Sequence, residues 1–257
     1  MGIQASIAVH AGAVVAAAVR PALWPWLLAG IVADHLALTA AGLWPRSSLL
    51  GPNLTHLPRS TGPGRVALTI DDGPDPAVTP QVLELLQRYR TQATFFCIGE
   101  RVGRYTELSR EIVARGHAIE NHTQRHLHRF SLLGPHGLTA EVAAAQDQIA
   151  TVTGRQPRFF RAPAGLRNPF LEPVLARLGL HLASWTRRGF DTVKDDADLV
   201  YARLTRGLGD GDILLLHDGH AARTRGGTPV VLEVLPRLLD AVAAARLTPV
   251  TLRSALP

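Results

Sequence analysis

The stretch "VALTIDDGPDP", residues 66–76, joins a β-branched apolar run to a turn rich in glycine and proline, and it places Asp71 and Asp72 at the junction. Taken alone, it fits a solvated turn, because Asp-Gly and Asp-Pro pairs often follow a strand. Two carboxylates at the end of a buried strand also suit an active site. The rest of the chain has to supply their partners before the second interpretation is preferred.

From residue 66 onward the chain alternates short β-rich runs with helical ones. We expect strands at 66–70, 93–97, 117–121, 158–161, 181–186, 212–216 and 248–252, and helices at 78–90, 104–115, 139–153, 170–178, 196–207 and 230–245. This alternation implies parallel pairing, and the number of units predicts an α/β fold of the barrel type. In such a barrel the carboxyl ends of the strands share one face, which carries the active site.

The composition is that of a globular protein, with 257 residues and a net charge of +6 that comes almost wholly from arginine. The arginines are scattered and no aromatic platform accompanies them, so we expect no nucleic-acid partner. An anionic lipid or an acidic substrate is compatible with this charge. The single cysteine, Cys97, excludes an internal disulfide and predicts a small buried side chain on a strand.

The first 45 residues form a separate hydrophobic segment. Residues 3–19 contain no Asp, Glu, Lys or Arg, and residues 22–44 contain only Asp34 as a charged residue. A transmembrane helix needs about 20 apolar residues, so both runs are borderline. We expect a membrane-embedded or membrane-apposed helical hairpin, with a pair of buried helices packed on the domain as the alternative. Tryptophans near the ends of the second run suit a membrane interface: Trp24, Trp26 and Trp44.

Residues 46–64 are rich in proline, glycine, serine and threonine and lack periodicity, so they are predicted to be a linker. The expected organisation is therefore a hairpin at 1–45, a linker at 46–64 and a catalytic domain at 65–257.

Polar residues lie at several of the expected strand ends. His122 and His126 lie four residues apart after the third strand, and a helical turn there would point both imidazoles toward one ion. Two imidazoles and one carboxylate leave coordination positions open, as a catalytic metal requires. Zinc suits hydrolysis, although non-haem iron oxygenases use the same ligand set. One aspartate of the pair could bind the metal while its neighbour takes a proton from water.

Two further strand ends complete this hydrolytic interpretation. Arg161, in "RFFRAPAGLRNP", could hold the base ionised, and the turn after it could turn backbone N–H groups toward an oxyanion. His217, in "DILLLHDG", is a candidate general acid for the leaving group. The loop after it contains His220, to which we give no functional role, and Arg223 and Arg225, which could meet an anionic substrate group or be solvated; we favour the solvated interpretation.

The ordered motifs "TIDDG", "HTQRH", "RAPAG", "RRGFDT" and "LLLHD" resemble the polysaccharide deacetylases with the NodB homology domain, carbohydrate esterase family 4, over about residues 65 to 252. The resemblance implies a distorted (β/α) barrel of about seven strands and metal-dependent removal of an N- or O-acetyl group from a sugar. It also implies individual roles: Asp71 as base, Asp72, His122 and His126 as metal ligands, Arg161 bracing Asp71, Ala164 in the oxyanion hole, Leu215 in the acetyl pocket, His217 as acid and Asp191 tuning it. The implied cofactor is a divalent metal, first Zn²⁺, with Co²⁺, Ni²⁺ or Mn²⁺ as alternatives.

The sequence leaves the substrate open. The leading hypothesis is a membrane-associated deacetylase of N-acetylated glycan in the bacterial cell envelope, acting on a carbon–nitrogen bond other than a peptide bond. A deformylase or deacetylase of a lipid-linked sugar is the alternative within the hydrolases. A non-catalytic glycan-binding module is a remote alternative, because every polar role of the site is still filled.

Overall fold

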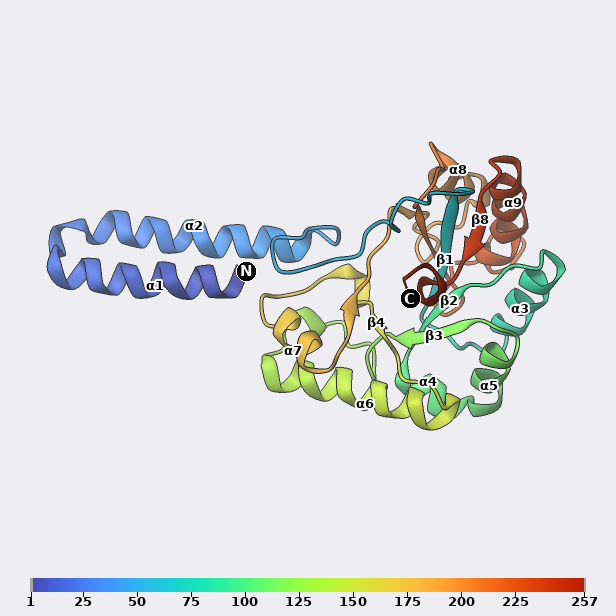
Figure 1. Ribbon diagram of the computed structural model, residues 1–257, viewed down its shortest axis with the longest axis horizontal. Helices are drawn as coiled ribbons and strands as arrows, with labels where there is room; N and C mark the ends of the chain where they lie inside the picture. Colours follow the sequence, from blue (N-terminus) through green and yellow to red (C-terminus); the bar gives the residue numbers. More distant parts are fainter. Residues whose placement is uncertain (1, 257) are drawn as a thin grey trace.

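The computed structural model describes residues 2–256 and has two visibly different parts (Figure 1). A hairpin of two antiparallel helices, α1 (Gly2–Val19) and α2 (Trp24–Leu43), projects away from an α/β body, and a short 3₁₀ turn, η1 (Pro21–Leu23), forms its tip. The hairpin contacts the body only at its base, so the two helices are not packed along the domain.

The body is built on one curled parallel sheet. Its strands are β1 (Arg65–Asp71), β2 (Thr94–Cys97), β3 (Ala118–Asn121), β4 (Phe159–Phe160), β5 (His181–Leu182), β6 (Arg187–Arg188), β7 (Ile213–His217) and β8 (Thr248–Val250). Seven of them follow the order β5-β4-β3-β2-β1-β7-β6, and β8 pairs with the start of β1. The predicted distorted barrel is confirmed as an open, half-closed one, and Cys97 is buried at the end of β2.

Helices cover the outer face of this sheet (Figure 1). They are α3 (Thr79–Arg88), α4 (Gly99–Arg104), α5 (Thr106–Ala114), α6 (Pro135–Thr153), α7 (Leu171–Arg177), α8 (Ala197–Thr205) and α9 (Val230–Ala244), followed by the short α10 (Leu252–Ala255). The 3₁₀ turns η2 (Phe130–Leu132) and η3 (Pro163–Gly165) lie in loops. The main core forms where the apolar faces of α3 and α9 meet the outward side chains of β1 and β7.

Two predicted elements differ from those observed. The predicted strand at 181–186 is shorter than expected, because only β5 lies within it; the chain then bends at Thr186 and pairs as β6 with β7 at the other edge of the sheet. The predicted helix at 104–115 corresponds to α5, and a further helix that was not predicted, α4, ends just before it at Arg104.

Residues 46–64 contain no helix, and they run along the body. Leu50 and Leu57 are buried, and Leu54 forms an isolated parallel bridge with Ala183 at the edge of the sheet. The Leu57 N–H donates to the Gly211 carbonyl at 2.8 Å. The segment is therefore packed against the body between the hairpin and β1.

The base of the hairpin lies against the loop that follows β4. The Arg167 N–H donates to the Gly42 carbonyl at 3.2 Å, and the Ser184 hydroxyl donates to the Pro45 carbonyl at 2.7 Å. Pro45 approaches Gly165 so closely that a Cβ there would lie 2.6 Å from the proline ring. The hairpin is thus attached beside the carboxyl ends of the strands.

Candidate active site

A pocket of about 660 Å³ opens at the carboxyl ends of the strands. Its lining includes Asp71, Asp72, His122, His126 and His217, which come from the ends of β1, β3 and β7 and the loops after them. Parallel pairing sets Asp71 beside His217 in register, so strand geometry brings together residues almost 150 positions apart.

Asp72, His122 and His126 form a compact cluster whose donor atoms all lie within 4.8 Å of one another. Asp72 Oδ1 lies 3.1 Å from His122 Nε2 and 3.2 Å from His126 Nε2. The expected helical turn between the two histidines is absent, and that expectation is wrong. A loop brings them together instead. The Thr123 hydroxyl accepts the His126 N–H at 2.9 Å, and the backbone has positive φ at Thr123 and at His126.

The donor set fits a divalent metal. The His122 Nδ1–H donates to the Arg161 carbonyl at 2.9 Å, which directs Nε2 toward the cluster. Burial lowers the pKa of His122, but the carboxylates of Asp71 and Asp72 outweigh burial and raise that pKa. Asp72 Oδ1 is buried without a hydrogen-bond partner although two imidazole nitrogens lie close to it. A buried carboxylate oxygen without a hydrogen-bond partner needs a compensating contact, and the N₂O donor set that it forms with the two imidazoles suits Zn²⁺ and related ions.

The electrostatics keep these ligands ready for a cation. Burial raises the pKa of Asp72, but the imidazoles of His122 and His220 outweigh it and hold the pKa well below its usual value. Burial, together with the charge of His122, lowers the pKa of His126 to about 4. At neutral pH the cluster therefore presents an ionised carboxylate and at least one neutral imidazole, the forms that bind metals.

Asp71 lies beside this cluster but has a different partner. Arg161 Nη1 donates to Asp71 Oδ1 at 2.7 Å and to the Thr69 hydroxyl at 2.8 Å. The guanidinium is almost fully buried, donates also to the carbonyls of Ala183 and Ser184, and lies 4.1 Å from the centre of the Phe96 ring. These bonds fix Arg161 and leave Asp71 Oδ2 as the oxygen not engaged by the guanidinium.

His217 and Asp191 form a second buried pair. Asp191 Oδ1 lies 2.8 Å from His217 Nδ1, and its other oxygen accepts the His217 backbone N–H at 2.7 Å. Burial opposes charge on His217, but the Asp191 carboxylate outweighs burial and raises the pKa of His217 to about 9. The imidazole is therefore protonated at neutral pH, with Nδ1 on Asp191.

The remaining residues named from the sequence also line the pocket. Leu215 is buried on β7, and Ala164 lies on the η3 turn. That turn is closed by the N–H groups of Gly165 and Leu166, so neither bond uses the N–H of Ala164. Trp185 packs against the turn, because a Cβ on Gly165 would lie 2.6 Å from the indole.

Left-handed backbone is concentrated in this site. The non-glycine residues with positive φ here are Asp72, Thr123, His126, Ala164 and His220. Such a conformation costs an L-residue about 1–2 kcal/mol, and it persists only where the surroundings enforce it. The fold is therefore less stable at these positions than it would be with ordinary backbone angles, and the side chains and N–H groups of these residues face the site as a result.

Two residues of the site were not identified from the sequence. His220 was given no functional role, yet its Nδ1 lies 3.2 Å from Asp72 Oδ2 and its Nε2 lies 3.2 Å from Arg101. Asp218 is buried behind Asp72, where it accepts the Thr79 hydroxyl at 2.5 Å and the Gly219 N–H at 2.9 Å. Burial raises the pKa of Asp218 to about 7. The only signal in the sequence for Asp218 and His220 is that they come within three residues after His217.

Comparison with known proteins agrees with this geometry. The family model "Polysaccharide deacetylase" matches residues 59–183. A peptidoglycan-N-acetylglucosamine deacetylase of Bacillus cereus is 34% identical over 175 residues, which cover 67% of this chain and 81% of the relative. A chitooligosaccharide deacetylase of Bradyrhizobium sp. is 36% identical over 161 residues, covering 62% and 73%.

Solved structures give the same result. A family 4 carbohydrate esterase from Streptomyces lividans, in complex with acetate, superposes with a TM-score of 0.65 at 31% identity, covering 72% of this chain and 91% of that one. The chain therefore belongs to the polysaccharide deacetylase family, carbohydrate esterase family 4, and the resemblance predicted from its five motifs is confirmed.

Proposed function

We propose that the protein is a metal-dependent hydrolase that removes an acetyl group from an N-acetylated, or O-acetylated, sugar of a glycan. One observation carries this proposal: a single pocket contains the Asp72–His122–His126 cluster, the Arg161-braced Asp71 and the His217–Asp191 pair. The relatives named as deacetylases of peptidoglycan and of chitooligosaccharides support the acetyl sugar as substrate class.

In this proposal the two neighbouring aspartates have different tasks. Asp72, His122 and His126 hold the ion, which supplies Lewis-acid activation of water when bound. Asp71 accepts the proton from the attacking water, because its carboxylate lies beside the cluster and Arg161 fixes its orientation.

His217 serves as the acid. Its Nδ1 is held by Asp191, so Nε2 is free to donate a proton to the leaving amine or hydroxyl of the sugar. Ala164, on the η3 turn of the pocket lining, donates its N–H to the developing oxyanion, while Leu215 contacts the acetyl methyl group.

The test is release of acetate from N-acetylglucosamine oligomers and from peptidoglycan, measured with formate release in the same assay. Chelation of the metal should abolish release, and Zn²⁺ or Co²⁺ should restore it. Full activity in a preparation shown by elemental analysis to be metal-free would end the proposal of a catalytic metal.

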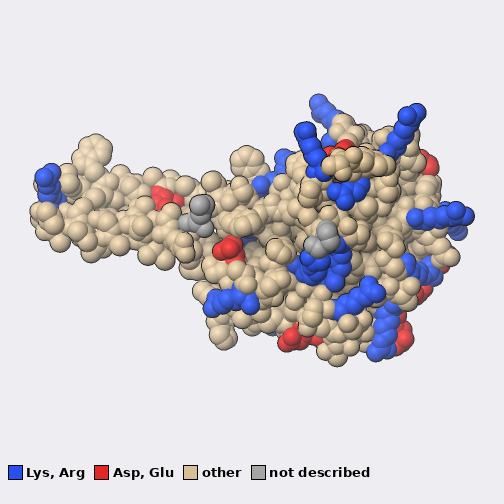
Figure 2. Space-filling model, viewed as in Figure 1, with Lys and Arg blue, Asp and Glu red and all other residues tan. Residues whose placement is uncertain are grey.

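We also propose that the hairpin places the enzyme at a membrane of the cell envelope. α1 and the segment Pro21–Leu43 are each long and apolar enough to cross a membrane, and only 6% and 11% of their apolar windows are buried. Figure 2 shows the hairpin almost free of charged residues, whereas basic residues are frequent on the body. α2 is about 30 Å long, the thickness of a bilayer core, and exposed tryptophans lie at both of its ends.

The pocket lining favours a second candidate, in which the sugar bears an anionic group and a lipid. Four arginines line the pocket: Arg101, Arg104, Arg125 and Arg188. Apart from Asp71 and Asp72, the only acidic residue that the structure describes in the lining is Glu100. Arg188 lies over the rings of Trp185 and Phe190, at 5.3 and 4.8 Å, and its buried Nε has no hydrogen-bond partner. The hairpin base lies against Gly165 in the same pocket, so a substrate held in the bilayer would reach the site from nearby.

The two candidates are separated by substrate and by one variant. A deacetylase or deformylase of a lipid-linked sugar phosphate should act on that substrate in vesicles far better than on neutral oligomers. Arg188→Gln should raise KM for the phosphate-bearing substrate and leave KM for neutral oligomers unchanged, and Arg225→Gln, an exposed arginine outside the pocket, is the matched control. Equal KM changes for both substrates would favour the neutral glycan.

A further inference from the structure

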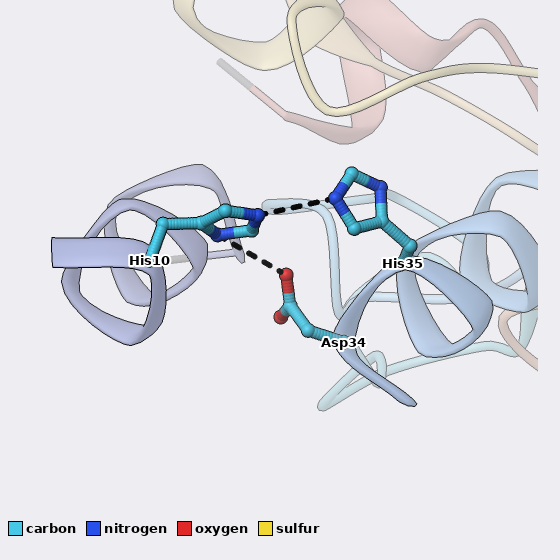
Figure 3. Close-up of side chains that lie close together, drawn as sticks. All are labelled: His10, Asp34 and His35. Carbon is cyan, nitrogen blue, oxygen red and sulfur yellow. Dashed lines mark hydrogen bonds and ion pairs between the residues drawn. The ribbon is translucent and has the colours of Figure 1, made fainter. Parts of the chain in front are cut away.

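The hairpin carries a polar cluster halfway along its length, where its two helices face each other. His10 of α1 and Asp34 and His35 of α2 offer three donor atoms that all lie within 4.8 Å of one another. Figure 3 shows His10 between the other two side chains: its Nε2 faces His35, and its Nδ1 lies 4.0 Å from Asp34 Oδ2. From these three residues we propose a second metal site, separate from the catalytic pocket, for Zn²⁺ or another divalent transition metal.

The spacing of the donors fits one ion. His10 Nε2 lies 3.2 Å from His35 Nε2. Two nitrogens bound at about 2.0–2.1 Å to a tetrahedral ion are separated by about 3.3–3.4 Å. The pair is therefore already at ligand spacing, and the ring planes cross at 80°, as two ligands that approach one ion from different directions can.

Each helix also orients its ligand through a further contact. His10 Nδ1 lies 2.8 Å from the Ser6 carbonyl, which only accepts, so the proton is on Nδ1 and the lone pair of Nε2 points to His35. The Ser6 hydroxyl donates to Asp34 Oδ2 at 2.5 Å and leaves the other carboxylate oxygen free of that bond. Metal-binding histidines and carboxylates commonly have such second contacts.

Charge gives an independent reason for a cation here. Asp34 is the only acidic residue of the hairpin. Arg20 is the only lysine or arginine there, and it lies at the tip, about 20 Å from Asp34 along the helix axis. A carboxylate in an apolar setting is costly without a partner, and an ionisable residue in a membrane segment marks a functional site by default. A divalent ion would neutralise Asp34 and join the two helices, and three protein ligands leave one position for water or an anionic oxygen.

The competing explanation is a metal-free clasp, in which His35 Nε2–H donates to His10 Nε2. Metal stoichiometry distinguishes the two in the full-length chain in detergent micelles, loaded with Zn²⁺, desalted and measured by elemental analysis. Wild type should hold two equivalents, His35→Gln one, Asp72→Asn one, and the double variant close to none. Thr39→Ala, which changes a polar residue of α2 outside the cluster, should keep two.

A spectroscopic readout supports the count without relying on activity. Co²⁺ added to the Asp72→Asn chain should give the visible absorption of a tetrahedral site, and the additional change His35→Gln should abolish it. Hydrolysis of a soluble substrate by His35→Gln itself should equal that of wild type. A single wild-type equivalent that is lost in Asp72→Asn, or a second equivalent that survives His35→Gln, overturns the hairpin site. A single wild-type equivalent that survives Asp72→Asn and is lost in His35→Gln contradicts the catalytic metal.

Discussion

Replacing Asp191 by asparagine should move the alkaline limb of the pH–rate profile to lower pH. The proposed acid, His217, must be protonated to work, and the Asp191 carboxylate at 2.8 Å is the main influence that raises its pKa to about 9 against burial. Removing a buried opposite charge at this distance shifts a pKa by about 1–3 units. We therefore expect the alkaline limb to move about 2 pH units toward lower pH, which corresponds to a loss of roughly 2.7 kcal/mol in stabilisation of the imidazolium.

The assay is kcat/KM for acetate release across the neutral and alkaline range. Wild type should lose activity as pH rises through about 9, whereas Asp191→Asn should lose it near neutrality, with metal content unchanged. Asp195→Asn, an exposed acid four residues away, is the control and should keep the wild-type profile. A profile of Asp191→Asn whose alkaline limb coincides with that of wild type, or lies above it, would refute the assignment of His217 and Asp191.

The same pair predicts how stability depends on pH. The folded pKa of His217 lies above the ordinary value of 6.5, so its stabilising contribution is complete below pH 6.5 and is lost as pH rises through about 9. The difference in Tm between wild type and Asp191→Asn should accordingly be largest on the acid side of this window and shrink across it.

Three further outcomes are expected. Asp72→Asn should lower metal occupancy, whereas Asp71→Asn should keep the metal and slow turnover by about 100-fold or more, and equal loss of metal in both variants would contradict the division of tasks. Gly73→Ala should lower Tm and metal occupancy at a cost of about 1–3 kcal/mol, because the added Cβ would lie 2.5 Å from both carboxylate oxygens of Asp218, and an unchanged Tm would show that the turn adapts. The full chain should fractionate with membranes and resist carbonate extraction through residues 2–43, and extraction by carbonate would indicate that the hairpin lies at the interface instead.

The elements of the fold were readable from the sequence because local forces set them. β-branched runs alternate with amphipathic helices from residue 66 onward, and parallel pairing of such strands leaves one face for chemistry. Their ends were less predictable. Helix α4, just before the predicted helix at 104–115, was not expected, and the predicted strand at 181–186 ends early at Leu182, because each boundary depends on packing against distant parts of the chain.

The polar residues of the site were also predictable, since each lies at the end of a buried strand or directly after it: Asp71, His122, Arg161 and His217. Their mutual arrangement was not. The sequence predicted a helical turn that brings His122 and His126 together, whereas the structure uses a left-handed loop stabilised by the Thr123 hydroxyl. Positive φ at a residue that is not glycine has little local signature, because the surrounding structure and not the residue type enforces it.

The sequence by itself determined which residue types occupy the strand ends, that the body is an α/β barrel and that a hydrophobic segment precedes it. These features depend on periodicity and composition within a few residues. Only the tertiary structure brought His220 to Asp72 and Asp191 to His217, placed the hairpin base against Gly165, and faced His10 toward His35. Each of these contacts joins residues at least 25 positions apart, and their geometry depends on chain crossings and helix pairing that no local pattern encodes.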